Sequence, residues 1–391
     1  MRDVVPEADV VSVTLPAFVC GISFAKPRIT PHNVELSLCK RLYHKTPVPD
    51  HRIFAGLRGF VRKWVRRNLK PLSDLMTFEE WIEETNYSSK RKQHFRELYE
   101  KSTPRDVFTA KVKCFVKDEF YPKPKAPRMI SSREDVAKCY LGPIFASIEK
   151  VVYKLPYFVK HLTAEQRVRR IHEVFGLDDV YVTDYTAFET QFHSKMMWNV
   201  EMQVYDYLLR DFPEAKELVR VILGKNKLRS KYFTGTLEAV RMSGEMNTSL
   251  GNGISNLLFM LYAAECNGVD VERIIVEGDD GLVKLSQPID PEFFKKMGLE
   301  IKMAKAKPYN ASFCGCVYNP ETLTNFGHPI DLLAKIGWAP RKALNISARR
   351  KRELLISKVY SACAEHAGVP IVWKFCELVL KHEGRITFAR A

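Results

Sequence analysis

The sequence predicts an α+β fold in which mixed helices and antiparallel strands are followed by a helical C-terminal part. From about residue 111 onward, short β-rich runs alternate with longer runs that have helical apolar periodicity. The run RIIVEGDDGLVKLS (273–286) has the pattern of a strand, a tight turn and a second strand, because Gly278 and Gly281 flank two aspartates. At 391 residues the chain is too long for one ordinary core, which predicts two or three domains or one multi-lobed domain.

The first part of the chain is predicted to contain an extended arm, basic helices and a pair of strands. Residues 1–50 are punctuated by proline and are expected to be extended. The run RIFAGLRGFVRKWVRRNLK (52–70) predicts an amphipathic basic helix, whose charged face is either solvated or in contact with RNA. Two helical pieces follow in 77–101. The runs VKCFVKDEF (112–120) and PRMISSRE (127–134) predict two strands.

The middle and the end of the chain supply the remaining elements. DVYVTDYTAF (179–188) predicts a strand, and KMMWNVEMQVYDYLLRDF (195–212) predicts one helix. TSLGNGISNLLFMLYAAEC (248–266) predicts another helix, and PEFFKKMGLEIKMAKAKP (291–308) predicts a helix that runs into a strand. The tail from residue 346 onward is predicted to be helical.

Charge and cysteine usage narrow the class of protein. Lysine and arginine number 61 against 46 acidic residues, so the surface favours a polyanion, either nucleic acid or an anionic membrane. The acidic N-terminus does not resemble a secretory signal, and its apolar run is broken by Pro16, so no membrane anchor is expected. Nine cysteines without a CxxC pair indicate a reducing compartment. Cys314 and Cys316 are expected on alternate sides of a strand; zinc binding is the alternative.

The hairpin at residues 278–281 carries two adjacent carboxylates, Asp279 and Asp280. Neighbouring carboxylates repel each other, and hard divalent cations such as Mg²⁺ or Mn²⁺ would relieve that repulsion. One hairpin cannot hold two such ions, so a further carboxylate is required, and Asp184 at the end of another predicted strand is the best candidate. The alternative is an ordinary hairpin turn, since turns are rich in glycine and aspartate.

The helix predicted to continue as an apolar segment begins with small and polar residues, RMSGEMNTSLGNGISN (241–256). Ser243, Gly244, Thr248 and Asn252 together indicate contact with something other than protein. Thr248 and Asn252 are four residues apart and therefore share a helix face. Ser243 or Thr248 alone could instead be a cap residue of a buried helix.

These motifs resemble those of the RNA-dependent RNA polymerases of positive-strand RNA viruses, most closely the tombusvirus-like and nodavirus-like replicases. The resemblance is carried by DYTAFE (184–189), RMSGEMNTSLGNGISN, EGDDG (277–281) and FVKDEFYPKPKAPRMISSRED (115–135), within a span of roughly residues 111–320. It implies a right-hand fold with fingers, a palm built on an antiparallel sheet with the GDD hairpin, and a helical thumb. The expected division is 1–178 for the N-terminal arm and fingers, 179–192 for the first palm strand, 193–237 for fingers and palm helices, 238–320 for the palm, and 321–391 for the thumb.

The resemblance also implies a reaction, template-directed transfer of nucleotides from NTPs to an RNA 3′-hydroxyl with two Mg²⁺ or Mn²⁺ ions. Asp184 and Asp279 would be the principal metal ligands, Asp280 would assist them, and Tyr185 would belong to the same metal site. A lysine, either Lys305 or Lys307, would protonate the departing pyrophosphate.

Contacts to nucleotide and RNA are implied for several other residues. Ser243 and Gly244 would lie against template and incoming nucleotide, while Thr248 and Asn252 would point at the ribose, with Asn252 reading the 2′-hydroxyl. Glu189 stands where the family usually has an aspartate bonded to that asparagine. The expected phosphate contacts are Lys117, Lys123, Lys125 and Arg128, and the expected RNA contacts are Arg133, Arg349, Arg350, Lys351 and Arg352.

The expected partners are an RNA template, the product duplex, NTPs and a viral membrane-anchoring replicase protein. The expected location is the host cytoplasm, at membrane-associated replication complexes. Two other functions compete with RNA synthesis: a reverse transcriptase, which shares the two-aspartate hairpin, and a non-catalytic RNA-binding protein, for which the basic charge would suffice.

Overall fold

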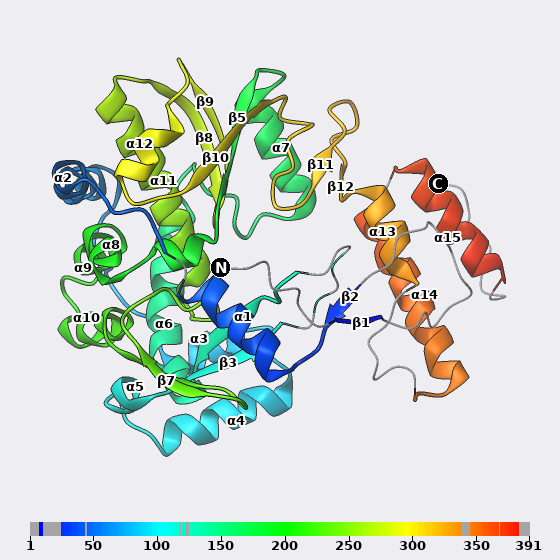
Figure 1. The fold of residues 1–391 in the computed structure, drawn as a ribbon, viewed down its shortest axis with the longest axis horizontal. Helices are drawn as coiled ribbons and strands as arrows, with labels where there is room; N and C mark the ends of the chain where they lie inside the picture. Colours follow the sequence, from blue (N-terminus) through cyan, green and yellow to red (C-terminus); the bar gives the residue numbers. More distant parts are fainter. Residues whose placement is uncertain are drawn as a thin grey trace.

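The computed structural model describes residues 8–10, 25–43, 45–117, 119, 121, 125–337, 345–366 and 368–382. Helices and strands are mixed through most of the described chain, and helices alone follow at its C-terminal end (Figure 1). Two four-stranded sheets organise the larger part of the molecule. The α+β class predicted from the alternating runs is therefore observed.

The first of these sheets has the strand order β10-β5-β9-β8, and every neighbouring pair is antiparallel. Its strands are β5 (Val180–Tyr185), β8 (Val271–Glu277), β9 (Asp280–Leu285) and β10 (Ile301–Ala306). Helix α11 (Thr248–Asn267) packs against β8 and β9. This helix is buried on nearly every side, which explains why its sequence is so apolar after the first turns.

The second sheet has the order β4-β3-β6-β7. Its strands are β3 (Val112–Val116), β4 (Met129–Arg133), β6 (Asn226–Arg229) and β7 (Thr234–Leu237). Burial alternates along β3 and β4, as expected for strands with one face on a core. The strand pair predicted from 112–120 and 127–134 is confirmed, with Cys114 opposite Ser131.

Helices from the first half of the described chain pack around the two sheets. They are α1 (Pro31–Arg41), α2 (His51–Asn68), α3 (Phe78–Glu84), α4 (Ser89–Glu100), α5 (Asp106–Thr109), α6 (Asp135–Val152) and α7 (Ala164–Phe175). The amphipathic helix predicted over 52–70 is confirmed as α2, whose buried face carries Leu57, Val61 and Val65. A short strand pair, β1 (Ala8–Val10) and β2 (Ala25–Pro27), precedes α1.

The single helix predicted over 195–212 is wrong, because the chain forms α8 (Ser194–Asn199) and α9 (Glu201–Leu208) instead. The helix breaks at Val200, which has φ −115° and ψ −85°. The physical reason lies in the next residue: Glu201 is fully buried and pairs at 2.9 Å with the guanidinium of Arg241, which is also buried. Helix α10 (Pro213–Val219) follows, with 3₁₀ turns η1 (Phe188–Gln191) and η2 (Arg220–Leu223) on either side of α8–α10.

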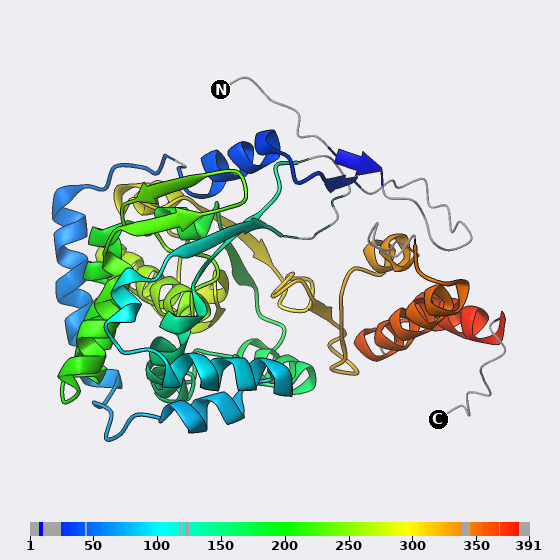
Figure 2. The same cartoon turned by 90° about the horizontal axis from the view of Figure 1, so that it is seen from below.

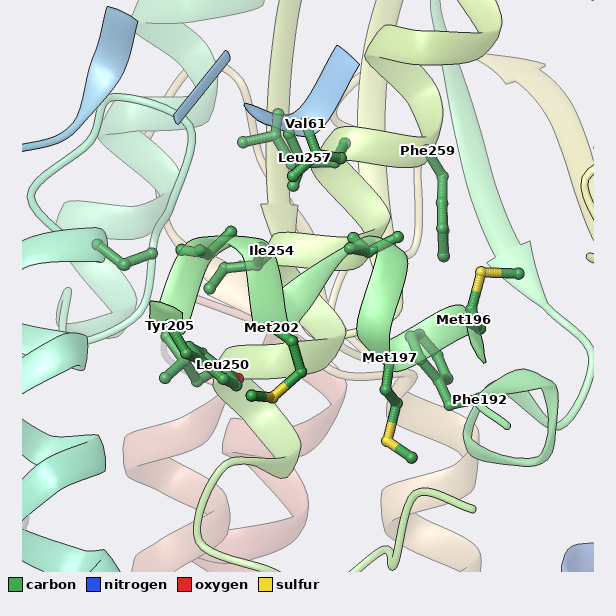
Figure 3. Close-up of a cluster of buried hydrophobic side chains, with 14 of the residues drawn as sticks. Val61, Phe192, Met196, Met197, Met202, Tyr205, Leu250, Ile254, Leu257 and Phe259 are labelled. Carbon is green, nitrogen blue, oxygen red and sulfur yellow. The ribbon is translucent and has the colours of Figure 1, made fainter. Parts of the chain in front are cut away.

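The largest core lies where α2, α8, α9 and α11 meet. Figure 3 shows this cluster, with Val61 and Leu257 at one end and Phe192, Met196 and Met197 at the other. Because α11 runs through it, the position of the polar start of α11 is fixed by packing of its apolar remainder.

The C-terminal helices form a separate group with its own core, on one side of the molecule in both views (Figures 1 and 2). Strands β11 (Val317–Tyr318) and β12 (Asn325–Phe326) and helix α12 (Pro291–Lys296) come before this group. Its helices are α13 (Pro329–Ile336), α14 (Ala348–Glu365) and α15 (Pro370–His382). The predicted helical tail is confirmed for the described residues. Among those residues no helix has both the length and the apolar character needed to cross a bilayer.

Candidate active site

Strands β5 and β9 bring three carboxylates to one end of the same sheet. Thr183 pairs with Gly281 in the antiparallel register, so the next residues along each strand are Asp184 and Asp280. Asp279 lies in the two-residue turn between Glu277 and Asp280. Gly278, the other residue of that turn, has φ 58°, a conformation that costs glycine little and other residues more. The turn therefore presents Asp279 beside the end of β5.

Burial and, after it, repulsion between neighbouring carboxylates perturb the pKa values of this cluster. Burial raises the pKa of Asp279 above its ordinary value, and the nearby Glu189 and Asp184 raise it further. Burial also raises the pKa of Asp280 to about 6, with Asp279 adding to the shift. The main-chain N–H of Cys314 donates to Asp280 Oδ2 at 3.2 Å and opposes that rise.

The three carboxylates have the chemistry of a metal site but not its full geometry. Three carboxylates of this kind suit Mg²⁺ or Mn²⁺, and a cation would offset both the burial and the carboxylate repulsion that raise the pKa values of Asp279 and Asp280. However, the described residues contain no set of three or more His, Cys, Asp or Glu side chains gathered tightly enough to hold an ion by themselves. The carboxylate oxygens are suitable ligands for such an ion, but the side chains would have to come closer together to coordinate it.

Asn256, on α11, stabilises the hairpin turn through hydrogen bonds from its side chain. Its side-chain amide donates to Gly278 O at 3.2 Å and to Asp280 O at 3.1 Å, the two carbonyls that flank Asp279. Gly281 completes the fit, because a Cβ at that position would overlap Thr183 Oγ1. Asn256 belongs to the motif 241–256 but had no predicted role; its position one helical turn after Asn252 was the available signal.

Glu277, just before the turn, is held by two cations. Its carboxylate lies 3.3 Å from Lys160 Nζ and 3.2 Å from Arg167 Nη2. The strand on which it lies is also bonded at its edge, where Val276 N donates to Tyr157 O at 2.8 Å. These contacts fix β8 on the side away from β9.

The residues before α11 form a loop that lies on β4. Ser243 Oγ donates to Met129 O at 3.2 Å, and Gly244 N donates to Ser131 O at 2.9 Å. The hydroxyl of Thr248 lies 2.9 Å from a carbonyl within the same loop, Glu245 O. Ser243, Gly244 and Thr248 thus have structural contacts within the protein, and their contacts with nucleotide stay predictions.

Asn252 differs from these residues. Its side chain is buried, and its Oδ1 has no hydrogen-bond partner among the described residues. A buried acceptor without a partner is uncommon in folded proteins and points to a missing donor. The bond expected between Asn252 and Glu189 is not formed in the described residues, and Glu189 instead lies 4.0 Å from the guanidinium of Arg41. Glu189 is presented by the turn η1, which the left-handed residue Ala187 (φ 47°) initiates.

A cavity of about 180 Å³ lies beside Glu189 and gathers several of the predicted residues. Its lining side chains are Arg41, Leu42, Lys117, Arg128, Met129, Ile130, Glu189, Arg241 and Ser243. Lys117, Arg128, Glu189 and Ser243 were predicted from sequence. Arg41 was missed, because nothing in the proline-punctuated arm shows that α1 packs on β3 and β4.

Glu119 organises the cations on one side of this cavity. Lys117 Nζ lies 2.5 Å from its carboxylate and Arg128 Nε donates to it at 2.8 Å. Burial alone would raise the pKa of Glu119, but the hydrogen bonds from Arg128 and Lys117 lower it to about 2. Lys125 lies 4.4 Å from the centre of the Tyr121 ring. Lys123 lies outside the described residues.

Arg133 does not fit its predicted RNA contact, and this prediction needs correction. Its side chain is buried, and it bonds to Glu245 Oε1 at 2.8 Å and to Asn226 Oδ1 at 2.7 Å. The guanidinium therefore links β4 to the loop before α11. By contrast, the basic run Arg349, Arg350, Lys351 and Arg352 begins α14 and is largely exposed, so its RNA contact stays a prediction.

The two lysines expected to serve the pyrophosphate are also placed elsewhere. Lys305 pairs with Tyr181 in the sheet, three residues from the end at which Asp184 lies. Lys305 and Lys307 both pair with Asp179, at 3.2 Å and 2.8 Å. The residue directly opposite Asp184 is Lys302, and side chains of directly opposed residues share a face of the sheet. The register, which the sequence does not show, therefore places Lys302 and neither predicted lysine opposite Asp184, and the roles of Lys305 and Lys307 stay predictions.

Cys314 and Cys316 do not lie in a strand, contrary to expectation. Phe313 and Cys316 exchange backbone hydrogen bonds around a tight turn in which Cys314 and Gly315 have φ 54° and 76°. The turn places the Cys314 N–H against Asp280. Tyr185, predicted in the metal site, is buried with no hydrogen-bond partner for its hydroxyl among the described residues; burial, and then Asp279, raise its pKa.

A family model described as viral RNA dependent RNA polymerase matches residues 34–325, more than half of the chain. The chain belongs to this viral polymerase family. Within the family match lie all of the hairpin carboxylates, Asn252 and every residue that lines the cavity around Arg41 and Glu189.

Individual members of this polymerase family show the same relationship at lower coverage. The chain is 28% identical over 217 residues to the RNA-directed RNA polymerase of striped jack nervous necrosis virus, covering 52% of this chain and 22% of that protein. It is 28% identical to the corresponding protein of Pothos latent virus, covering 50% and 29%, and 26% identical to that of tobacco necrosis virus strain A, covering 61% and 37%. The chain thus spans well under half the length of these relatives. The family predicted from the motifs is confirmed.

Proposed function

We propose that the chain is a template-directed RNA polymerase that transfers nucleotides from NTPs to the 3′-hydroxyl of an RNA strand. The observation that carries the proposal is the meeting of Asp184, Asp279 and Asp280 at one end of a sheet, where burial and then the neighbouring carboxylates raise the pKa values of Asp279 and Asp280. Such a cluster has no use on a protein that only holds RNA phosphates, since it would repel them. The similarity to RNA-directed RNA polymerases of other viruses supports the same reaction.

Asp184 and Asp279 are the residues proposed to hold two Mg²⁺ or Mn²⁺ ions, with Asp280 assisting. When bound, such ions supply charge that activates the attacking hydroxyl and stabilises the leaving pyrophosphate. The protein's own contribution is to keep Asp280 oriented through the Cys314 N–H and to keep the turn in place through Asn256.

Asn252 is proposed to read the ribose. Its buried Oδ1 lacks a donor, and a 2′-hydroxyl can supply one. A deoxyribonucleotide would leave that oxygen without a partner, which gives a physical reason for preferring NTPs over dNTPs. This reason also favours an RNA polymerase over a reverse transcriptase.

The triphosphate is proposed to bind at the cavity where Arg41, Lys117 and Arg128 converge. Arg128 can grip a phosphate with two N–H groups, but it must exchange part of its bonding to Glu119 to do so. Lys302, opposite Asp184, replaces Lys305 and Lys307 as the proposed contact for the departing pyrophosphate.

The right-hand architecture belongs to the same proposal. The sheet β10-β5-β9-β8 with α11 would be the palm, the sheet β4-β3-β6-β7 with the N-terminal helices the fingers, and α13–α15 the thumb. The domain limits predicted from sequence follow this assignment. RNA template, product duplex, a membrane-anchoring replicase partner and a location at host cytoplasmic membranes stay predictions.

The test is incorporation of radiolabelled NTPs on a short RNA template with Mg²⁺ and then Mn²⁺. Asp279→Asn should reduce incorporation more than about 100-fold, because even groups behind metal ligands contribute roughly 10–100-fold. Asp211 is an exposed aspartate outside the proposed catalytic site. Asp211→Asn is therefore the matched control and should keep full activity. Equal incorporation by Asp279→Asn and the parent would remove Asp279 from the catalytic site. No incorporation by the parent, with RNA binding intact, would identify a non-catalytic RNA-binding protein, and incorporation of dNTPs would identify a reverse transcriptase.

A further inference from the structure

A second and larger cavity lies between α2 and α8 and has no part in the site described above. Its volume is about 880 Å³, within the range of cavities that bind small ligands. In Figure 1, α2 and α8 lie at the edge of the molecule opposite the C-terminal helices. The lining residues are Val48, Pro49, His51, Phe54, Ala55, Arg58, His193, Ser194, Lys195, Trp198, Asn199 and Leu223.

The charge of this cavity is one-sided. Its lining includes two cations, Arg58 and Lys195, and two histidines, and none of the described residues that line it is acidic. Arg58 on α2 and Lys195 on α8 are both exposed, and neither has an ion-pair partner among the described residues. Nearby cations differ in this respect: Arg62 donates to Gln203 Oε1 at 2.7 Å, and Arg220 lies 3.5 Å from Asp206. Arg58 and Lys195 are thus available to an anionic ligand from two walls.

Aromatic side chains also line the cavity from both walls. Phe54 comes from α2 and Trp198 from α8, and both are half-buried. The ring of His193 lies 6.1 Å from that of Phe54, and its Nδ1 accepts from Met196 N at 3.3 Å, which leaves Nε2 for another partner. Flat apolar rings beside uncompensated cations are the combination that binds single-stranded nucleic acid, with bases stacked and phosphates paired.

The walls are held rigidly, so the cavity is preformed. The opposite face of α2 is buried through Leu57 and Val61, and Met196 and Met197 of α8 are buried in the same core. Asp50 caps α2 and also donates its backbone N–H to Lys296 O at 2.7 Å. A ligand would therefore lose little free energy to ordering of the protein.

We propose that this cavity is a second RNA site, which binds a single-stranded RNA segment outside the catalytic cluster. One or more bases would stack against Phe54 and Trp198, while Arg58 and Lys195 pair with the phosphates. The proposal rests on the proposed function only in naming RNA as the polyanion. The segment just before α8 is bonded to the segment just before α11, because Phe192 O accepts a hydrogen bond from Arg241 N at 3.2 Å.

The test measures binding of a fluorescein-labelled oligouridylate of eight nucleotides by anisotropy, without NTPs or divalent cations, over a range of salt concentrations. Arg58→Ala/Lys195→Ala should reduce the slope of log affinity against log salt by about 1.4, since each lost phosphate contact on a single strand contributes about 0.7. The control Lys90→Ala/Arg105→Ala removes two exposed cations that have no ion-pair partner in the described chain, and should leave the slope unchanged. Equal effects of the two double variants would overturn the proposal.

A second measurement tests the stacking residues. Trp198→Ala should weaken binding by about 5- to 150-fold, the range expected for loss of one stacked base, and Trp198→Phe should restore most of it. Oligonucleotides that carry 4-thiouridine should crosslink to peptides containing Phe54 or Trp198 in the parent protein. The absence of such crosslinks while RNA still binds elsewhere would refute the proposed RNA site in this cavity. The occupant of the cavity would then be a protein or a small molecule.

The two proposals can fail separately. NTP incorporation without crosslinks at the cavity would remove the second RNA site and leave the polymerase function intact. Crosslinks at the cavity, lost in Arg58→Ala/Lys195→Ala, from a protein that incorporates no NTPs would support the RNA site and remove the polymerase function.

Discussion

Replacing Asn256 tests whether the hairpin turn needs its own support from α11. The Asn256 side chain is almost fully buried and its amide donates to both carbonyls that flank Asp279, Gly278 O and Asp280 O. Asn256→Ala removes one NH₂ group and leaves two acceptors short of a donor. An unsatisfied buried polar group costs about 1–3 kcal/mol, and water that enters the space of the lost amide would lower this, so we expect a loss of about 1–2 kcal/mol in the free energy of unfolding.

The effect on activity should exceed what this loss of stability explains. If the turn shifts, Asp279 moves relative to Asp184, and catalytic groups displaced by about 1 Å can cost on the order of 100-fold in rate. We therefore expect kcat for NTP incorporation to fall by about 10- to 100-fold while the protein remains folded. Asn256→Asp should be at least as severe, because a carboxylate would then face two carbonyl oxygens beside Asp280.

The assay combines urea denaturation with steady-state incorporation at a temperature where all variants are folded. Asn267→Ala is the matched control, because Asn267 lies at the other end of α11 and its amide donates to Ala263 O at 2.7 Å. It should lose stability to a similar or smaller extent and keep its kcat. If Asn256→Ala and Asn267→Ala have the same kcat as the parent, the hairpin does not depend on Asn256 and the reasoning is wrong.

Three further changes test other parts of the molecule. Burial raises the pKa of Glu149 to about 7, so between about pH 4.5 and 7 the folded state holds a proton that the unfolded state has released. The free energy of unfolding should therefore fall by up to about 3 kcal/mol as the pH rises through this range. Urea denaturation across pH 5–8 should show this fall in the parent protein and not in Glu149→Gln. Gly251→Ala should unfold or destabilise the protein by more than about 3 kcal/mol in the same measurement, because the added Cβ would overlap Arg241 and Glu201 and separate a buried ion pair. Arg41→Ala should raise KM for NTPs severalfold with little change in kcat in the incorporation assay, and an unchanged KM would remove this residue from the phosphate site.

Elements that depend on local sequence could be predicted. Thr77 begins α3 with a capping box in which Glu80 returns the hydrogen bond, as the residue types and spacing require. The periodicity of 52–70 gave α2, because a helix buries its apolar stripe wherever it packs. Asp184 and the GDD turn could be placed together because both were read as ends of strands.

Contacts that depend on register or on distant packing could not be predicted. Lys302 and Lys305 are equally plausible in a sequence, yet a strand alternates its faces, and only the pairing with β5 shows that Lys302 lies opposite Asp184. Arg133 has the composition of a phosphate contact, and only the burial of Glu245 and Asn226 beside it shows that its charge is already used. The break at Val200 likewise follows from a partner, Arg241, that is remote in the chain.

Glu189 shows why the cations and the carboxylates of this site must be considered together. Its carboxylate raises the pKa of Asp279, while its own ion partner Arg41 and the neighbouring Arg128 line the cavity proposed for the triphosphate. A triphosphate in that cavity would compete with Glu189 for those cations, and cations at the hairpin would at the same time offset the repulsion between Glu189 and Asp279. Binding of the nucleotide and of the ions would therefore be coupled through one side chain. Because Glu189 is one methylene longer than an aspartate, its carboxylate reaches toward Arg41, while Asn252 Oδ1 has no partner among the described residues.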